Sequence, residues 1–129
     1  MENQGIIFIA HGSKKEASNE EFILMCETIS HNIQNFSHKK AAFLELATPS
    51  IQSVVEEFLE DGVKRIVCYP FFLNSGKHVQ VDIPNIIKEL QTLNSEVKFE
   101  LLPHFGTSAK INDIIVNDIN EHILATKIF

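Results

Sequence analysis

The sequence contains no apolar run long enough to cross a bilayer, which takes about 20 mainly apolar residues. Its first residues, Met1-Glu2-Asn3-Gln4, also lack the basic start and the following apolar stretch of a secretory signal. We therefore expect a cytosolic protein that makes no use of a membrane.

Cysteine is scarce as well, with Cys26 and Cys68 as its two occurrences. They are far apart in the chain and show neither the CxxC spacing of many metal and redox sites nor the density of a disulfide scaffold. We expect both to be reduced thiols in the core.

Positive charge is in short supply, because 17 acidic residues outnumber 11 lysines and arginines and leave a net charge of −6. Non-specific binding of nucleic acid needs clustered positive charge, so this balance argues against DNA or RNA as a partner. An anionic small ligand is still compatible with the sequence if local lysines and backbone amides receive it.

What the sequence does contain is a regular alternation of two patterns. Its 129 residues, 44% of them hydrophobic, suit one domain with a single core, residues 1–129. Short apolar runs typical of buried strands alternate with segments of helical periodicity. The strands are expected at residues 5–10, 41–46, 65–73 and 97–102, and the helices at 18–34, 48–62, from 82 and from about 108. This alternation predicts an α/β three-layer sandwich around a four-stranded parallel sheet, with 2-1-3-4, the flavodoxin-like order, as the common arrangement.

Local signals predict where the helices begin and end. Ser18 or Asn19, Thr48 and Asp82 are the expected N-caps, with Pro49 at the first helical position after Thr48. Gly62 is the expected stop of the second helix. The last helix is expected to be buried through a stripe of isoleucines: Ile111, Ile114, Ile115, Ile119 and Ile123.

Polar residues follow three of the predicted strands. His11 ends the first, Glu45 lies at the end of the second, and His78 follows the third after a turn-rich loop, so that successive members are about one strand–helix unit apart. The carboxyl ends of parallel strands share one edge, where ligands bind at the point at which the strand order reverses. We therefore expect His11, Glu45 and His78 to meet there in a metal and proton-transfer site.

The residue types indicate an open site. Two imidazoles suit a borderline ion such as Fe²⁺, Co²⁺ or Ni²⁺ and leave coordination positions free, whereas the sequence has no Cys/His cluster of a closed four-ligand site. A loop histidine is more often solvated or structural, and Glu45 alone is compatible with a strand-end charge, but three residues at equivalent positions favour function. His104 follows the fourth strand, and its participation is left open. The remaining histidines are expected to face solvent: His31, His38 and His122.

Three blocks carry a resemblance to a known family. These are IAHGS (9–13), AFLELATPSI (42–51) and PFFLNSGKHV (70–79) followed by DIP (82–84), and they resemble the signature blocks of CbiX/SirB-type sirohydrochlorin chelatases across residues 5–106. Such class II chelatases insert a divalent metal ion into a tetrapyrrole without ATP. The resemblance implies Fe²⁺ or Co²⁺ insertion into sirohydrochlorin, in siroheme or cobalamin biosynthesis.

The resemblance also implies roles for particular residues. His11 and His78 would hold the incoming metal, His11 would accept a proton as well, and Glu45 would contact the macrocycle and assist its deprotonation. No permanently bound cofactor is expected, since the metal ion is a substrate. This chain resembles the short single-domain forms, which pair as homodimers. The loop expected to lie against the substrate consists of Phe72, Leu73, Asn74, Ser75, Gly76 and Lys77. The lysines expected to offset the carboxylates of the substrate are Lys14, Lys15, Lys77 and Lys110.

Other functions remain compatible with the sequence. One is Ni²⁺ insertion for coenzyme F430 synthesis, because imidazole accepts all three ions. Another is a metal-binding or tetrapyrrole-binding module without turnover. A small flavodoxin-like regulatory domain is a third, but the acidic cluster that a phospho-receiver needs after the first strand is missing.

Overall fold

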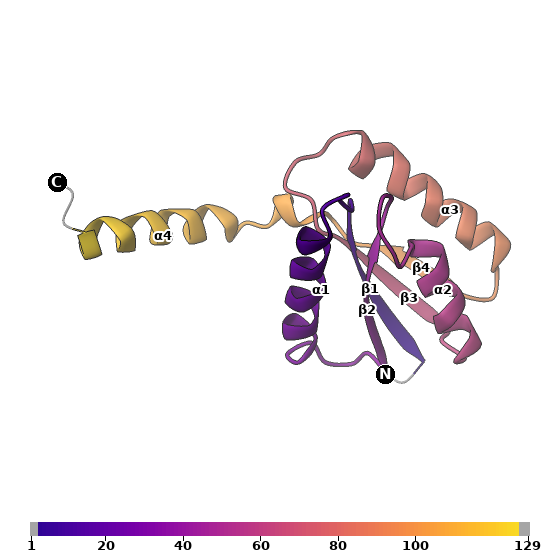
Figure 1. Cartoon of the computed structure of the whole chain (residues 1–129). Coiled ribbons are helices and arrows are strands. Elements are labelled where there is room, and N and C mark those ends of the chain that lie inside the picture. The colour runs from indigo at the N-terminus through magenta and orange to yellow at the C-terminus, as the bar shows by residue number, and fades with distance from the viewer. Residues whose placement is uncertain (1–2, 127–129) are drawn as a thin grey trace.

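The computed structural model describes residues 3–126 and consists of one parallel sheet with helices packed on it (Figure 1). The strands are β1 (Gln4–Ala10), β2 (His38–Phe43), β3 (Arg65–Pro70) and β4 (Lys98–Leu101), in the order β2-β1-β3-β4. All three pairings are parallel, which confirms the predicted α/β class and strand order. The order reverses between β1 and β3, the strands that precede His11 and the loop to His78.

Helices cover the two faces of the sheet unequally. On one face lie α2 (Ile51–Glu60) and α3 (Ile83–Leu93), whereas α1 (Glu16–Ser30) lies on the other (Figure 1). Alternation along β1 supplies both cores, since Ile7 and Ile9 pack toward α2 and α3 while Ile6 and Phe8 pack toward α1. β1 is therefore buried on both faces, and it holds the start of the loop that carries His11 in place.

The helix starts differ from the predicted caps. α1 begins at Glu16 after Lys15, so Ser18 and Asn19 lie inside the helix and cap nothing, and the helix ends at Ser30, before residue 34. α2 is capped by Ser50, whose side chain accepts a hydrogen bond from the Ser53 amide at 3.1 Å. The expected start at Thr48 and Pro49 was wrong, because both residues lie in the loop before Ser50; the peptide bond between them is cis. Gly62 does end α2, with a φ of +84° that favours glycine.

The third helix is preceded by a π-helix, η1 (His78–Asp82), that the sequence did not predict. Asp82 has helical backbone angles and makes no side-chain cap, so its predicted role was wrong. The other boundaries shift by a few residues. β2 begins at His38 rather than at residue 41, and β3 ends at Pro70 rather than at residue 73. Isolated π turns are frequent at functional sites.

The last helix contradicts the prediction of a buried stripe. After a 3₁₀ turn, η2 (Phe105–Thr107), α4 (Ile111–Thr126) projects away from the sheet (Figure 1). Its isoleucine side chains are about half exposed: Ile114 is 53%, Ile115 49% and Ile119 54% exposed. Periodicity marks an apolar face, but it does not say which surface covers that face.

Among the described residues, no helix is both long and apolar enough to span a membrane. Cys26 and Cys68 are buried and unpaired, as expected.

Candidate metal site

The sheet brings His11 and Glu45 side by side just beyond β1 and β2. Parallel pairing continues past the strand ends, because the Leu44 amide donates to the Ala10 carbonyl at 2.9 Å and the Glu45 amide donates to the His11 carbonyl at 3.0 Å. Both residues thus leave the sheet on the same side, from adjacent strands. Their side chains meet, with His11 Nε2 at 2.8 Å from Glu45 Oε2.

Gly12 allows this close approach. Its φ of +99° is accessible to glycine at little cost, and a Cβ at this position would lie 1.8 Å from the Glu45 carbonyl oxygen. The backbone of the Glu45 loop therefore packs directly on the chain that follows His11. A side chain at residue 12 would push the two apart.

His78 completes the group from η1. Its ring centroid lies 4.5 Å from that of His11, with the ring planes inclined by 55°. One ligand atom from each of His11, Glu45 and His78 lies within 4.8 Å of the other two. The structure therefore brings together the three residues singled out in the sequence.

Hydrogen bonding fixes which nitrogen of His11 faces the site. Its Nδ1 lies 2.8 Å from the Gly12 carbonyl oxygen, which can only accept, so Nδ1 carries a proton. Nε2 is then the nitrogen that faces Glu45, and the 2.8 Å contact between them requires one proton shared by the pair. A metal ion that binds His11 Nε2 displaces that proton.

His78 is oriented by a carboxylate that sequence reasoning missed. Asp82 Oδ2 accepts a hydrogen bond from His78 Nδ1 at 2.8 Å, which leaves Nε2 with a free lone pair. A carboxylate behind the histidine is a recurrent feature of metal sites, where it fixes the tautomer and the ring orientation. The His78–Asp82 spacing of four residues was the available signal, but Asp82 was interpreted as a helix cap.

Asn19 is a second residue with an unforeseen role. It is 5% exposed, and it clamps the loop after His11 by accepting from the Ser13 amide at 3.0 Å and donating to the Ser13 carbonyl at 2.8 Å. A buried amide that makes both bonds holds the loop to the first turns of α1. No sequence pattern marked this contact between residues six positions apart.

The arrangement suits reversible capture of a divalent ion. Two imidazole nitrogens suit first-row transition metal ions, and a carboxylate lies beside them, so that two histidine ligands leave coordination positions free. The site is accessible, since the side chains of His11 and Glu45 are 35% and 53% exposed. An ion held in this way can be passed to another ligand.

The predicted substrate loop lies beside His78. Phe72 packs partly on the core with its ring 6.5 Å from the His78 ring, while residues 73–77 are exposed. Lys77 Nζ lies 3.9 Å from Asp82 Oδ1. His104 is outside the trio and immediately precedes η2, where its carbonyl accepts a hydrogen bond from the Thr107 hydroxyl. His38 does not simply face solvent as expected, because its Nε2 lies 3.0 Å from Asp61 Oδ2.

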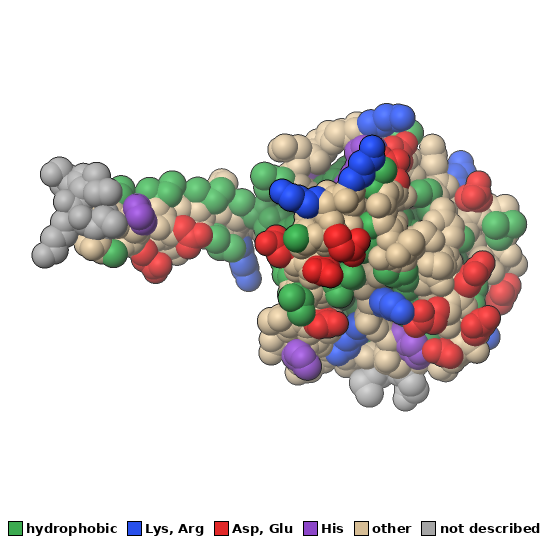
Figure 2. Space-filling model, viewed as in Figure 1, with side chains coloured by type: hydrophobic (Ala, Val, Ile, Leu, Met, Phe, Trp, Pro, Cys, Tyr) green, Lys and Arg blue, Asp and Glu red, His purple; other side chains and the backbone are tan. Residues whose placement is uncertain are grey.

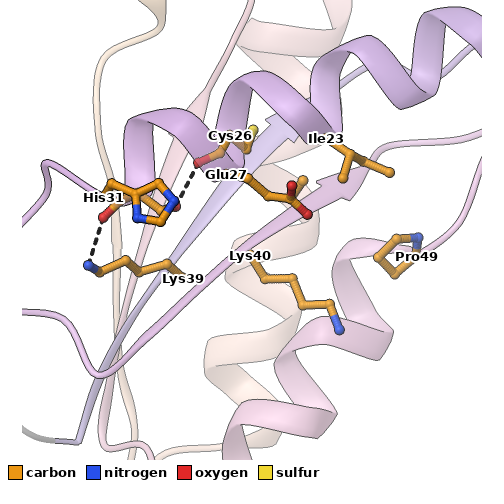
Figure 3. Close-up of a pocket in the computed structure, with 9 residues that line it drawn as sticks. Ile23, Cys26, Glu27, His31, Lys39, Lys40 and Pro49 are labelled. Carbon is orange, nitrogen blue, oxygen red and sulfur yellow. Dashed lines mark hydrogen bonds between the residues drawn. The ribbon is translucent and has the colours of Figure 1, made fainter.

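A second hollow, of about 550 Å³, lies between α1 and β2 (Figure 3). Both lysines that line it already have partners: Lys39 donates to the carbonyls of Ser30 at 2.8 Å and Ile33 at 2.7 Å, and Lys40 donates to the Glu57 carboxylate at 2.9 Å. None of the three clustered residues lines it. This hollow is therefore separate from the cluster of His11, Glu45 and His78.

The comparisons with known proteins point to one family. The CbiX family model matches residues 5–122. The chloroplastic sirohydrochlorin ferrochelatase of Arabidopsis thaliana is 32% identical over 124 residues, which cover 94% of this chain and 53% of the relative. The sirohydrochlorin cobaltochelatase of Methanococcoides burtonii is 34% identical over 87 residues, covering 67% of this chain and 66% of the relative.

Solved structures share the fold. A CbiX protein from Marinobacter aquaeolei VT8 matches with a TM-score of 0.82 and 28% identity, covering 95% of this chain and 98% of that one. The sirohydrochlorin chelatase SirB from Bacillus subtilis, solved with cobalt, matches with a TM-score of 0.82 over 92% of this chain and 50% of that one. At 20% identity, this second match is a likeness of fold alone.

This chain spans about half the length of two of the ferrochelatases that it matches, namely 53% of the Arabidopsis thaliana protein and 43% of the Priestia megaterium protein. The match of the family model nevertheless includes both histidines and Glu45. The chain therefore belongs to the CbiX family.

Proposed function

We propose that this protein inserts Fe²⁺ or Co²⁺ into sirohydrochlorin without ATP, as a chelatase of siroheme or cobalamin biosynthesis. The observation that carries the proposal is the convergence of His11, Glu45 and His78, whose ligand atoms lie within 4.8 Å of one another at an open edge of the sheet. Relatives named sirohydrochlorin ferrochelatase and sirohydrochlorin cobaltochelatase support the choice of tetrapyrrole and of metal.

In the proposed reaction, Nε2 of His11 and Nε2 of His78 hold the incoming ion. The pyrrole nitrogens of the macrocycle then replace the protein ligands one after another, and the two pyrrole protons leave as the M²⁺ ion enters. The pair of His11 and Glu45, 2.8 Å apart, loses its shared proton when the ion binds and is placed to take up one pyrrole proton as the ion leaves, while the second passes to solvent. Charge balances because one divalent cation replaces two protons.

The exposed loop next to His78 is the proposed contact for the macrocycle. The substrate-binding residues are Glu45 together with Phe72, Leu73, Asn74, Ser75, Gly76 and Lys77. Lys14 and Lys15, exposed in the loop after β1, and Lys77 supply positive charge for the carboxylates of the substrate. Lys110 is less suited to this role, since it immediately precedes the projecting α4.

The proposal also includes the assembly and the place of action. We propose that residues 1–129 act as one domain, that two copies pair as a homodimer, and that the protein works in the cytoplasm. No permanently bound cofactor is part of this mechanism. The metal ion is consumed with each turnover.

An anaerobic absorbance assay tests the activity. Sirohydrochlorin is mixed with Fe²⁺, Co²⁺ or Ni²⁺. The rate at which the absorption spectrum of the metallated product appears is then compared with and without protein. We expect faster metallation by Fe²⁺ or Co²⁺ in the presence of the wild type and near-complete loss of that gain in His78→Ala. A rate equal to that of the free solution reaction would instead indicate a binding module without turnover. Acceleration confined to Ni²⁺ would contradict the proposed metals.

A further inference from the structure

One polar residue lies in the buried stripe of α1. The buried residues of this helix are Asn19, Phe22 and Cys26, three and four positions apart, which is the period of a helix face that packs on a sheet. Acidic side chains occupy the outward side of α1 (Figure 2). Within the part of the chain that the structure describes, Asn19 is the one polar side chain in the buried class. Burial of an amide costs free energy unless it is hydrogen-bonded, so the bonds that Asn19 makes indicate what it does.

Both of these bonds go to the backbone of a single residue outside the helix. Oδ1 of Asn19 accepts a hydrogen bond from the Ser13 amide at 3.0 Å, and Nδ2 donates to the Ser13 carbonyl at 2.8 Å. A backbone N–H can only donate and a carbonyl can only accept, so the orientation of the side-chain amide is unambiguous. Asn19 therefore pairs with the loop after His11 much as a neighbouring strand would.

The Ser13 amide belongs to the same peptide unit as the carbonyl that contacts His11. This unit joins Gly12 to Ser13, and its oxygen lies 2.8 Å from Nδ1 of His11 while its N–H donates to Asn19. The C=O and N–H of a trans peptide point in opposite directions within one rigid plane. His11 and Asn19 therefore hold one peptide from its two sides, and hydrogen bonds run without a break from the buried amide to the imidazole.

Glycine makes this peptide easy to rotate. Gly12 has a φ of +99°, and it lacks the side chain that would restrict rotation of the next peptide. A half turn of that peptide would point its N–H, in place of its C=O, toward His11. Nδ1 would then accept a hydrogen bond, and the ring proton would reside on Nε2, the nitrogen that holds the ion in the proposed reaction. The bond from Ser13 to Asn19 opposes this rotation, because the rotation would break it.

We propose that Asn19 is a positioning residue for His11: it fixes the Gly12–Ser13 peptide in the one orientation that keeps the ring proton on Nδ1 and leaves Nε2 open to the metal ion. This inference rests on the proposed use of His11 as a metal ligand. Asn19 acts through the peptide and does not touch the ion. The two histidines are then oriented by different devices, since a carboxylate, that of Asp82, holds His78 directly at 2.8 Å.

Co²⁺ titration of two variants of α1 tests the effect on affinity. Asn19→Leu removes both hydrogen bonds and fills the space of the amide. We expect it to lower Co²⁺ affinity about 10-fold, the lower end of the usual cost of losing an outer partner of a metal ligand. Cys26→Ala is the matched control, because it also changes a buried residue of the same stripe, seven positions further along. It should leave Co²⁺ affinity unchanged.

Proton NMR of the Co²⁺-loaded protein observes the ring of His11 itself. The ring N–H of a Co²⁺-bound histidine gives a strongly shifted signal that disappears in D₂O and is lost by rapid exchange when no acceptor holds the proton. We expect two such signals in the wild type, one from each histidine. Asn19→Leu should lose the His11 signal and keep the His78 signal, whereas Asp82→Ala should do the reverse. Asn19→Asp retains an oxygen that accepts from Ser13, and it should keep both signals.

The outcomes distinguish this proposal from the proposed function. A wild type that binds no Co²⁺ would contradict the metal site and this proposal together. A wild type that binds Co²⁺ but shows only the His78 signal would overturn the role of Asn19 alone, and that measurement needs no variant. A folded Asn19→Leu protein with both signals and unchanged affinity would overturn it too, as would loss of the His11 signal in folded Asn19→Asp or an equal loss of affinity in Cys26→Ala.

Discussion

The carboxylate of Asp82 accepts a hydrogen bond from Nδ1 of His78 at 2.8 Å, and this bond leaves Nε2 of His78 available to a metal ion. Removing the carboxylate frees the imidazole to rotate and to exchange tautomers. We expect Asp82→Ala to lower Co²⁺ affinity about 10- to 100-fold, the usual cost of losing such a partner. Calorimetric titration with Co²⁺ measures this change.

The chain offers a matched control for that variant. Asp61 lies 3.0 Å from a ring nitrogen of His38, away from the trio. Asp61→Ala should leave Co²⁺ affinity unchanged. Equal losses in both variants would mean that Asp82 acts through general stability rather than through the orientation of His78.

Glu45 is proposed to move protons more than to hold the metal. In Glu45→Gln, an amide keeps nearly the same shape but cannot accept a proton as a carboxylate does. Turnover should therefore fall substantially while Co²⁺ affinity changes little. Parallel measurement of metallation rate and metal affinity separates the two roles, and loss of Co²⁺ binding would identify Glu45 as a ligand instead.

Alanine substitutions at Gly12 and Gly62, which both have positive φ, separate the cost of backbone strain from disruption of the metal site. A Cβ at Gly12 meets the Glu45 carbonyl at 1.8 Å, whereas nothing lies within 4 Å of a Cβ at Gly62. Gly62→Ala should cost about 1 kcal/mol of unfolding free energy and keep full Co²⁺ binding. Gly12→Ala should cost more and should also weaken Co²⁺ binding, because it separates Glu45 from His11. Urea unfolding and metal titration of both variants provide the comparison, and a Gly12→Ala protein with normal binding would refute the packing argument.

The buried thiols predict how stability depends on pH. Burial, with a smaller contribution from the Glu27 carboxylate, raises the pKa of Cys26 from 9.0 to about 12, and burial alone raises the pKa of Cys68 from 9.0 to about 12. Thiols of the unfolded chain ionise near pH 9, while those of the folded chain stay neutral. Their contribution to stability is therefore complete below pH 9 and decreases as the pH rises from 9 toward 12.

Urea unfolding on either side of pH 9 measures this decrease. The double variant Cys26→Ala/Cys68→Ala should be less stable overall but should lose less stability across this interval than the wild type. An identical alkaline loss in both proteins would show that the thiols are not its cause.

The sheet and the convergence of the trio could be predicted because they follow from robust rules. Buried parallel strands appear as continuous apolar runs, and residues that follow such strands meet at one edge whatever the details of the loops. This is why His11, Glu45 and His78 could be singled out before their distances were known.

The misses arose where one residue type is compatible with more than one local role. Asn19 and Asp82 have the residue types of N-caps, but their side chains bind Ser13 and His78 instead. The isoleucines of α4 indicate a buried face, yet periodicity within one chain does not reveal whether the covering surface belongs to the same chain. Residue propensity alone does not choose between these local roles, and it does not say which surface covers an apolar helix face.

The central claim, that one divalent ion is held jointly by His11 and His78, is tested most directly by Co²⁺ titration followed in the visible absorption of the bound ion. The account predicts one Co²⁺ per chain in the wild type, with a spectrum indicating nitrogen ligation, and loss of that spectrum in both His11→Ala and His78→Ala. An unchanged spectrum and affinity in either single variant would contradict it.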